Sequence, residues 1–146
     1  MNYLPAGANP ERYNEHTYEL GLKNFDKVLP RMEKFLQEKI LVSKIFYDCL
    51  DGKTNLTETN IELKTRSIHY NRVPMVTWLV PASKIKKAAA SPNKTIIFYY
   101  WARDDSLWYQ EFDQKIYDEL EIDYPSWHQY GSAHYYVPAS CFKRVC

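Results

Sequence analysis

The residues best suited to chemistry are Glu62 and Lys64, which lie two positions apart in the stretch NIELKTR. Side chains two apart in a β-strand share a face and are separated by about 6.6 Å. An acid and a base so placed suit a metal-assisted reaction at a phosphate ester. The spacing alone is weak evidence, because ten glutamates and thirteen lysines in 146 residues give about one Glu-x-Lys triplet by chance. An exposed ion pair on an edge strand, contributing about 0 to 1 kcal/mol, has the same pattern.

A second carboxylate is available at the end of the preceding apolar stretch, in FYDCLDG. If two adjacent antiparallel strands hold these segments, Asp48, with Asp51 nearby, comes close to Glu62. Two carboxylates and a backbone carbonyl form an oxygen-lined site of the kind that Mg²⁺ binds while keeping several waters. Such an ion activates a water molecule, and Lys64 would orient that water or offset charge on the transition state.

The hydrophobic pattern predicts an α+β (mixed α/β) fold with a central mixed sheet flanked by helices, and the length predicts a single domain over residues 1–146. A polar helix ending at Gly21 precedes an amphipathic helix from Asn24, in which Pro30 either makes a kink or opens a second half. The Asp51-Gly52 pair is a turn signal. The other predicted elements are strands near 41–50 and 60–68, a basic helix in ASKIKKAAAS, a central strand in KTIIFYYWA, a hairpin strand in LWYQEF, an acidic helix within 113–123 and a strand near 132–140. The segment NRVPMVTWLVP has no assignable shape.

Composition limits the classes of protein that fit. Hydrophobic residues make up 45% of the chain and the formal charge is +1, so the chain should fold, and a nucleic-acid contact needs a local basic patch. The opening residues resemble no standard secretion signal, and no apolar run has the roughly 18 residues of a membrane span. We therefore expect a soluble intracellular protein, with no membrane partner and free thiols at its three cysteines.

The succession of a helix, FYDCLDG, NIELKTR and the apolar strand KTIIFYYW resembles the PD-(D/E)XK nuclease superfamily, in particular small nuclease-like proteins of large DNA viruses and phages. The similarity covers about residues 25–112, and the tail HYYVPAS also looks like the end of such proteins. The resemblance implies a restriction-endonuclease-like core, DNA as the substrate and Mg²⁺ or Mn²⁺ as the cofactor. It also implies a location in the host cytoplasm or nucleus, or inside a virion.

Carried over to this sequence, the resemblance makes Asp48 the first metal-binding acid, with Asp51 the second choice. Glu62 becomes the second acid, Lys64 the catalytic lysine and the carbonyl of Leu63 a further metal ligand. A glutamate from the first core helix often joins such sites, for which Glu33 is the candidate and Glu38 or Glu19 the fallback. The sequence departs from the pattern because no proline precedes Asp48, and the thirteen residues between Asp48 and Glu62 require a bulged loop.

Basic and aromatic side chains near this site are candidates for contacts with DNA phosphates and bases: Arg66, His69, Tyr70, Arg72, Lys84, Lys86 and Lys87. A solvated basic face explains the lysines equally well.

Other chemistry is less favoured. Cys141, Cys146, His128 and His134 are four zinc-ligand types, but their spacing fits no common knuckle. The four scattered glycines exclude a phosphate-binding loop, and Trp101 is expected in the core.

Two classes of function remain. One is a metal-dependent DNA nuclease. The other is a non-catalytic virion, minor capsid or other structural subunit built on a nuclease-like fold, for which the abundance of tyrosine and tryptophan is suited to contacts with other virion proteins.

Overall fold

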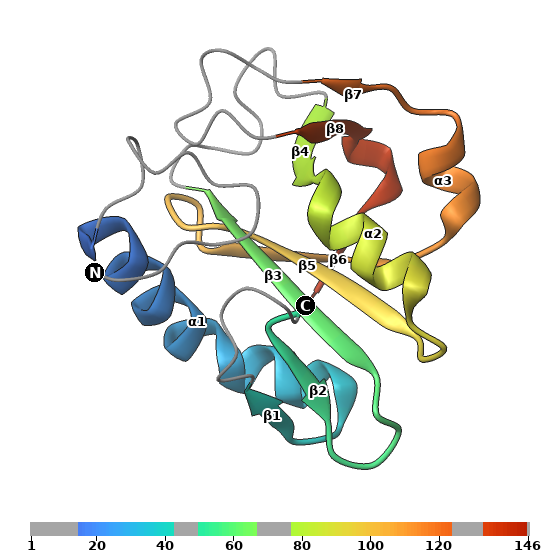
Figure 1. The fold of residues 1–146 in the computed structure, drawn as a ribbon. Coiled ribbons are helices and arrows are strands. Elements are labelled where there is room, and N and C mark those ends of the chain that lie inside the picture. The colour runs from blue at the N-terminus through green and yellow to red at the C-terminus, as the bar shows by residue number, and fades with distance from the viewer. Residues whose placement is uncertain (1–14, 43–49, 67–76, 124–132, 146) are drawn as a thin grey trace.

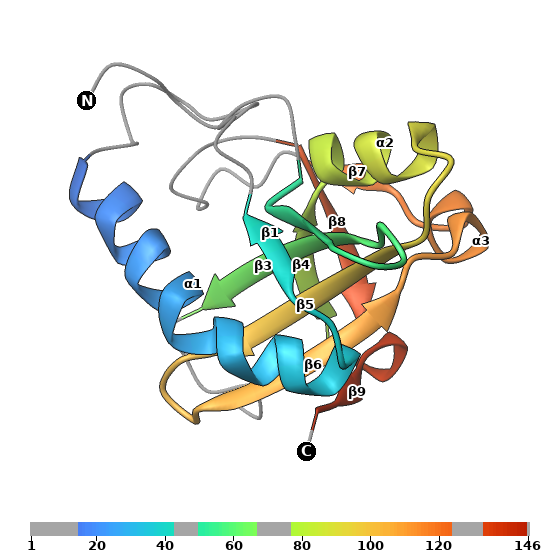
Figure 2. The ribbon, with the colours of Figure 1, turned by 90° about the horizontal axis from the view of Figure 1, so that it is seen from below.

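A computed structural model describes residues 15–42, 50–66, 77–123 and 133–145, with the backbone alone for 15–22. The protein is an α+β structure in which one long helix covers one face of a mixed sheet, and a second helix and a smaller sheet cover the other (Figures 1 and 2). The predicted fold class is therefore confirmed at this level. None of the helices in the described ranges is both long and apolar enough to cross a bilayer.

Helix α1 spans Glu15–Leu36 without a break, so the prediction of two helices separated near Gly21 is wrong. The helix also continues through Pro30, which excludes Pro30 as the start of a separate helix. A glycine inside a helix costs about 1 kcal/mol and a proline about 3 kcal/mol. Burial of Val28 and Met32 in the core offsets much of this cost, since burying such a side chain contributes about 1.5 to 3 kcal/mol.

The main sheet has the strand order β1-β2-β3-β5-β6-β9. Its strands are β1 (Ile40–Val42), β2 (Gly52–Thr54), β3 (Asn60–Arg66), β5 (Thr95–Trp101), β6 (Ser106–Glu111) and β9 (Lys143–Arg144). Strands β3 and β5 are parallel, and every other pair in this sheet is antiparallel. The connection from β3 to β5 passes through β4 (Thr77–Pro81) and α2 (Ala82–Ala90), as parallel neighbours require a crossover.

The smaller sheet has the order β4-β8-β7 and is antiparallel. Its other strands are β8 (His134–Pro138) and β7 (Ile122–Asp123), and the remaining elements are α3 (Gln114–Asp118) and the 3₁₀ turn Ala139–Cys141. The unassigned segment before residue 82 thus ends in β4, and the predicted elements at β3, α2, β5, β6, α3 and β8 are confirmed.

Gly52, predicted to belong to a turn, lies in a strand. It is the first residue of β2 and pairs with Val42 of β1, while Asp51 before it is a bend. A Cβ atom at position 52 would lie 2.8 Å from the carbonyl oxygen of Leu41. Glycine is therefore needed because the backbone of β1 approaches closely, and not because of a turn. Of the predicted strand at 41–50, residues 43–49 lie outside the described ranges.

Strand β5 is buried along its whole length, as predicted for a central strand covered on both sides. Its alternate residues contribute to two apolar clusters. Phe98 and Tyr100 pack with the buried face of α1. Tyr99 and Trp101 pack with Trp78 of β4 and with Ile85 of α2. The core position expected for Trp101 is confirmed.

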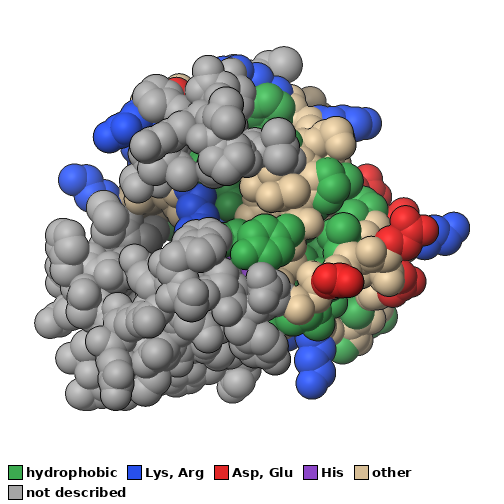
Figure 3. Space-filling view, turned by 90° about the horizontal axis from the view of Figure 1, so that it is seen from above, with side chains coloured by type: hydrophobic (Ala, Val, Ile, Leu, Met, Phe, Trp, Pro, Cys, Tyr) green, Lys and Arg blue, Asp and Glu red, His purple; other side chains and the backbone are tan. Residues whose placement is uncertain are grey.

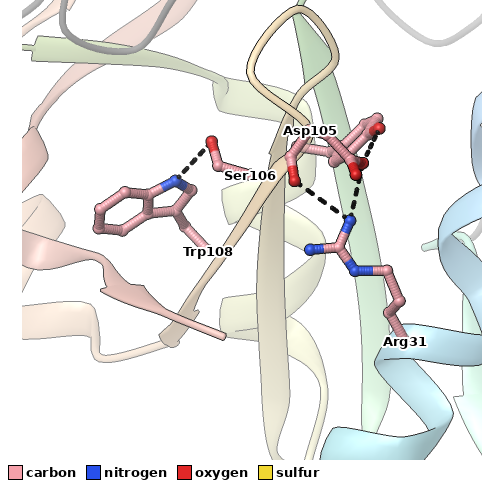
Figure 4. A network of polar contacts seen from close by, with 5 residues as sticks. Arg31, Asp105, Ser106 and Trp108 are labelled. Atoms are coloured by element: carbon pink, nitrogen blue, oxygen red, sulfur yellow. Dashed lines mark hydrogen bonds and ion pairs between the residues drawn. The ribbon is translucent and has the colours of Figure 1, made fainter. Parts of the chain in front are cut away.

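A polar network ties α1 to the turn between β5 and β6 (Figure 4). Arg31 Nη1 donates to Asp105 Oδ1 at 2.9 Å and to the Asp105 carbonyl at 3.3 Å, and the Tyr100 hydroxyl donates to the same Oδ1 at 2.6 Å. Trp108 Nε1 donates to Ser106 Oγ on the neighbouring strand β6. These contacts fix the sheet that carries β3.

Candidate active site

The register of β2 on β3 places Asp51 beside Glu62. Gly52 pairs with Ile61 and Lys53 with Asn60, so one further step along the ladder puts Asp51 opposite Glu62. The backbone N–H of Asp51 donates to Glu62 Oε2 at 3.3 Å, and the backbone N–H of Leu63 donates to Asp51 Oδ2 at 2.6 Å. The structure thus joins Glu62 to the acid that the sequence ranked second, while Asp48 lies outside the described residues.

Glu62 and Lys64 lie on the same face of β3, and the pairing of β3 with β5 shows which face of the sheet this is. Their partners on parallel β5 are Ile97 and Tyr99, which belong to the cluster under α2 and β4. Glu62 is buried and Lys64 is half-buried. An exposed ion pair on an edge strand is therefore excluded, because β3 is an interior strand and this face is covered.

Lys84, which the sequence assigns to DNA contacts, lies in the structure beside the acid pair. It projects from the first turn of α2, and its Nζ lies 3.6 Å from Glu62 Oε1, with side chains only 14% and 9% exposed. The sequence does show that Lys84 precedes Ala88 by four residues, which puts both side chains on one face of a helix. The structure shows that Ala88, and so this face, is buried. Lys86, by contrast, is exposed, and Lys87 is half-buried.

Burial and charge perturb all three central groups. Burial, and then the neighbouring Asp51, raises the pKa of Glu62 to about 8, against its ordinary 4.5. Burial also raises the pKa of Asp51, while the charge of Lys84 opposes the change. For Lys64, burial and then Arg66 hold the pKa well below 10.5. Paired acids with raised pKa values beside a lysine with a lowered one are typical of functional sites.

The acid pair fits a hard divalent cation. Mg²⁺ is commonly held by one or two carboxylates with several waters, and an ion between Asp51 and Glu62 would relieve the repulsion that raises the pKa of Glu62. Within the described ranges no group of three or more His, Cys, Asp or Glu side chains gathers as a larger metal site would. Leu63 contributes its N–H to Asp51, and ligation by its carbonyl stays a prediction.

The helix glutamates lie elsewhere. Glu33 Oε2 accepts the N–H of Ile40 at 2.8 Å, and Glu38 accepts the N–H groups of Leu56 and Thr57. Both line an open hollow of about 530 Å³ between the end of α1 and the β2–β3 turn. The structure therefore joins Glu33 to the start of β1 and Glu38 to the β2–β3 turn, and it joins neither to the acid pair. Glu19 lies where the backbone alone is described.

Among the predicted DNA contacts that the structure describes, Lys86 is exposed, Arg66 and Lys87 are half-buried, and Lys84 faces Glu62. Arg66 Nε donates to the Tyr99 hydroxyl at 3.2 Å, and its Nη2 is buried without a hydrogen-bond partner among the described residues. On the face in Figure 3, lysine and arginine side chains are dispersed over the described surface. His69, Tyr70 and Arg72 lie outside the described ranges.

Two of the four cysteine and histidine candidates for zinc lie within the described residues. Cys141, in the 3₁₀ turn, is a free thiol, and His134 is buried in β8. Cys146 and His128 lie outside the described ranges.

The fold and the site define an α+β protein in which half-buried Asp51 and buried Glu62 lie with Lys64, and with Lys84 of α2, on one covered face of a mixed sheet. Comparison of the chain with protein-family models, curated proteins and solved structures found no match.

Proposed function

We propose that the protein is a metal-dependent nuclease that hydrolyses phosphodiester bonds of DNA. The observation that carries the proposal is the convergence of Asp51, Glu62 and Lys64 on one covered face of the sheet, which strand register brings about. It is further supported by the resemblance of NIELKTR and its flanking elements to PD-(D/E)XK nucleases. The restriction-endonuclease-like core and the DNA substrate belong to this proposal.

In this mechanism Asp51 and Glu62 supply the carboxylate oxygens that hold a divalent cation. Bound there, Mg²⁺ or Mn²⁺ supplies Lewis-acid stabilisation of the phosphate and lowers the pKa of a water molecule. Lys64 Nζ takes the proton that the water gives up as its oxygen attacks phosphorus, because burial favours the neutral amine. The bond from phosphorus to the leaving oxygen then breaks, the leaving oxygen takes a proton from a water molecule, and Lys64 returns its own proton to solvent. The covered face limits access of bulk water.

The test is cleavage of supercoiled, linear and branched DNA with Mg²⁺ or Mn²⁺. We expect Asp51→Asn, Glu62→Gln and Lys64→Ala each to lower the rate by about 100-fold or more, because Lys64→Ala removes the proton acceptor and the other two each remove a carboxylate of the metal site. Asp48→Asn tests the acid that the sequence ranked first. The matched controls are Glu111→Gln and Lys94→Ala, which break an exposed acid–lysine pair 3.3 Å apart. A folded wild-type protein that cuts none of these substrates, or cutting that survives all three site substitutions, would refute the proposal.

A structural subunit is the second candidate, favoured by exposed apolar side chains at one edge of the main sheet. Leu41 and Val42 of edge strand β1 are 63% and 46% exposed, and Leu56 in the next turn is 75% exposed. Exposed apolar groups beside an unpaired strand edge suit contact with another protein. Leu41→Lys with Leu56→Lys would abolish such a contact and leave DNA cleavage unchanged.

A further inference from the structure

The position of Lys84 is costly for a lysine. It is the third residue of α2, where the helix dipole disfavours a cation, and the first turn of α2 contains no acid and no side-chain cap. Its side chain is 14% exposed, and burying an ammonium group is unfavourable unless a counter-charge is near. The acidic groups that face it come from other segments: Glu62 of β3, whose Oε1 lies 3.6 Å from Lys84 Nζ, and Asp51 beside Glu62.

The contact occupies a particular oxygen. Glu62 Oε2 accepts the N–H of Asp51, whereas Oε1 lies 3.6 Å from Lys84 Nζ. The ammonium group thus faces the Glu62 oxygen that is not bonded to Asp51, and a cation held by Glu62 would have to share this carboxylate with it. The charge of Lys84 also acts on Asp51, whose pKa it lowers against the effect of burial. One lysine therefore balances both acids.

We propose that Lys84 is an internal counter-ion that competes with the divalent cation for Glu62, and so sets the metal affinity of the site. This inference rests on the metal site of the proposed function. Without a cation, Lys84 stabilises the acid pair. With a cation, two positive groups share one carboxylate, and the ammonium group moves away from it or the ion binds weakly.

The test is the affinity for Mn²⁺ alone, measured by calorimetry and by the electron paramagnetic resonance signal of free Mn²⁺. We expect Lys84→Met, which keeps the apolar stem, to bind Mn²⁺ about tenfold more tightly than the wild type, because removal of a nearby positive charge strengthens attraction of the cation. Lys84→Arg keeps the charge and should bind like the wild type. Lys94→Met, which removes a lysine from an exposed pair with Glu111, is the matched control and should also match the wild type.

Thermal unfolding gives a second measurement. In EDTA, Lys84→Met should unfold at a lower temperature than the wild type, since the acid pair loses its counter-ion, and saturating Mn²⁺ should raise its midpoint by more than that of the wild type. If Lys84→Met does not fold in EDTA, Mn²⁺ must restore its folding, and Lys84→Gln is measured in parallel. Failure of Mn²⁺ to rescue either variant overturns the proposal.

The outcomes separate this inference from the nuclease proposal. Equal or weaker Mn²⁺ binding by Lys84→Met, or no binding by any variant, overturns the role of Lys84 whether or not the wild type cuts DNA. Tighter binding by Lys84→Met in a protein that cuts no DNA supports the counter-ion and refutes the nuclease.

Discussion

Replacement of Glu62 by glutamine should stabilise the protein at alkaline pH when no metal is present. The folded protein holds the Glu62 proton up to pH about 8, whereas the unfolded chain loses it near 4.5. Between these values the unfolded state binds fewer protons, so the free energy of unfolding of the wild type falls as pH rises. Each pH unit corresponds to about 1.4 kcal/mol, which limits the total loss to about 5 kcal/mol.

Glutamine keeps the shape and the acceptor oxygen of Glu62 without this loss, but it leaves Lys84 without its counter-charge. We therefore expect Glu62→Gln to exceed the wild type by about 2 to 4 kcal/mol above pH 8 in EDTA. This difference in the free energy of unfolding should shrink as pH falls from 8 to 4.5, and it should disappear below pH 4.5. Saturating Mn²⁺ should reverse the order, since only the wild type keeps both carboxylates.

The assay is urea denaturation followed by tryptophan fluorescence in EDTA from pH 4 to 9, comparing each variant with the wild type at the same pH. Glu111→Gln, in an exposed ion pair, is the control and should show little dependence on pH. If Glu62→Gln is no more stable than the wild type at pH 9, Glu62 is not a buried acid beside a second acid, and the electrostatic reasoning fails.

Two further predictions concern the elements that position the acid pair. Gly52→Ala should lower the free energy of unfolding by about 1 to 3 kcal/mol and weaken Mn²⁺ binding, because the added Cβ meets the Leu41 carbonyl oxygen at 2.8 Å and displaces Asp51; an unchanged urea midpoint would contradict this. Glu38→Gln should speed amide exchange at Leu56 and Thr57, whose N–H groups the carboxylate accepts. These bonds lower the pKa of Glu38, so in the wild type the same protection should persist just below pH 4.5 and be lost only at lower pH, where the folded carboxylate takes up its proton; equal exchange rates in Glu38→Gln and the wild type at pH 7 would show that the carboxylate does not hold the turn.

The sequence predicted the elements whose patterns are strong and local. The continuous apolar run of β5 and the period of two in β3 identify strands whatever their neighbours, and the helix formers of α2 need little tertiary help. The helix break predicted at Gly21 is wrong, because the low helix propensity of glycine is a local signal and packing of α1 on the main sheet outweighs it. That sheet is assembled from strands that are distant in the sequence.

The site was predicted in part for a similar reason. Glu62 and Lys64 share a face because of the strand period, which two residues suffice to define. The choice between Asp48 and Asp51 depends on register, and a shift of one residue moves a side chain to the other face. The ladder that pairs Gly52 with Ile61 is set by the close approach of β1 and by the β2–β3 turn, which Glu38 holds from the end of α1.

The sequence by itself determined that this chain forms an α+β fold and that one strand presents an acid and a lysine together. Only the tertiary structure decided that Asp51 joins them and that Lys84 lies against Glu62. The physical reason is distance along the chain: Asp51 directly precedes β2, Glu62 lies in β3 and Lys84 in α2, and their meeting depends on pairing and packing that no local pattern encodes. The raised pKa values of Asp51 and Glu62 follow from the same packing, because burial by other elements is their largest cause.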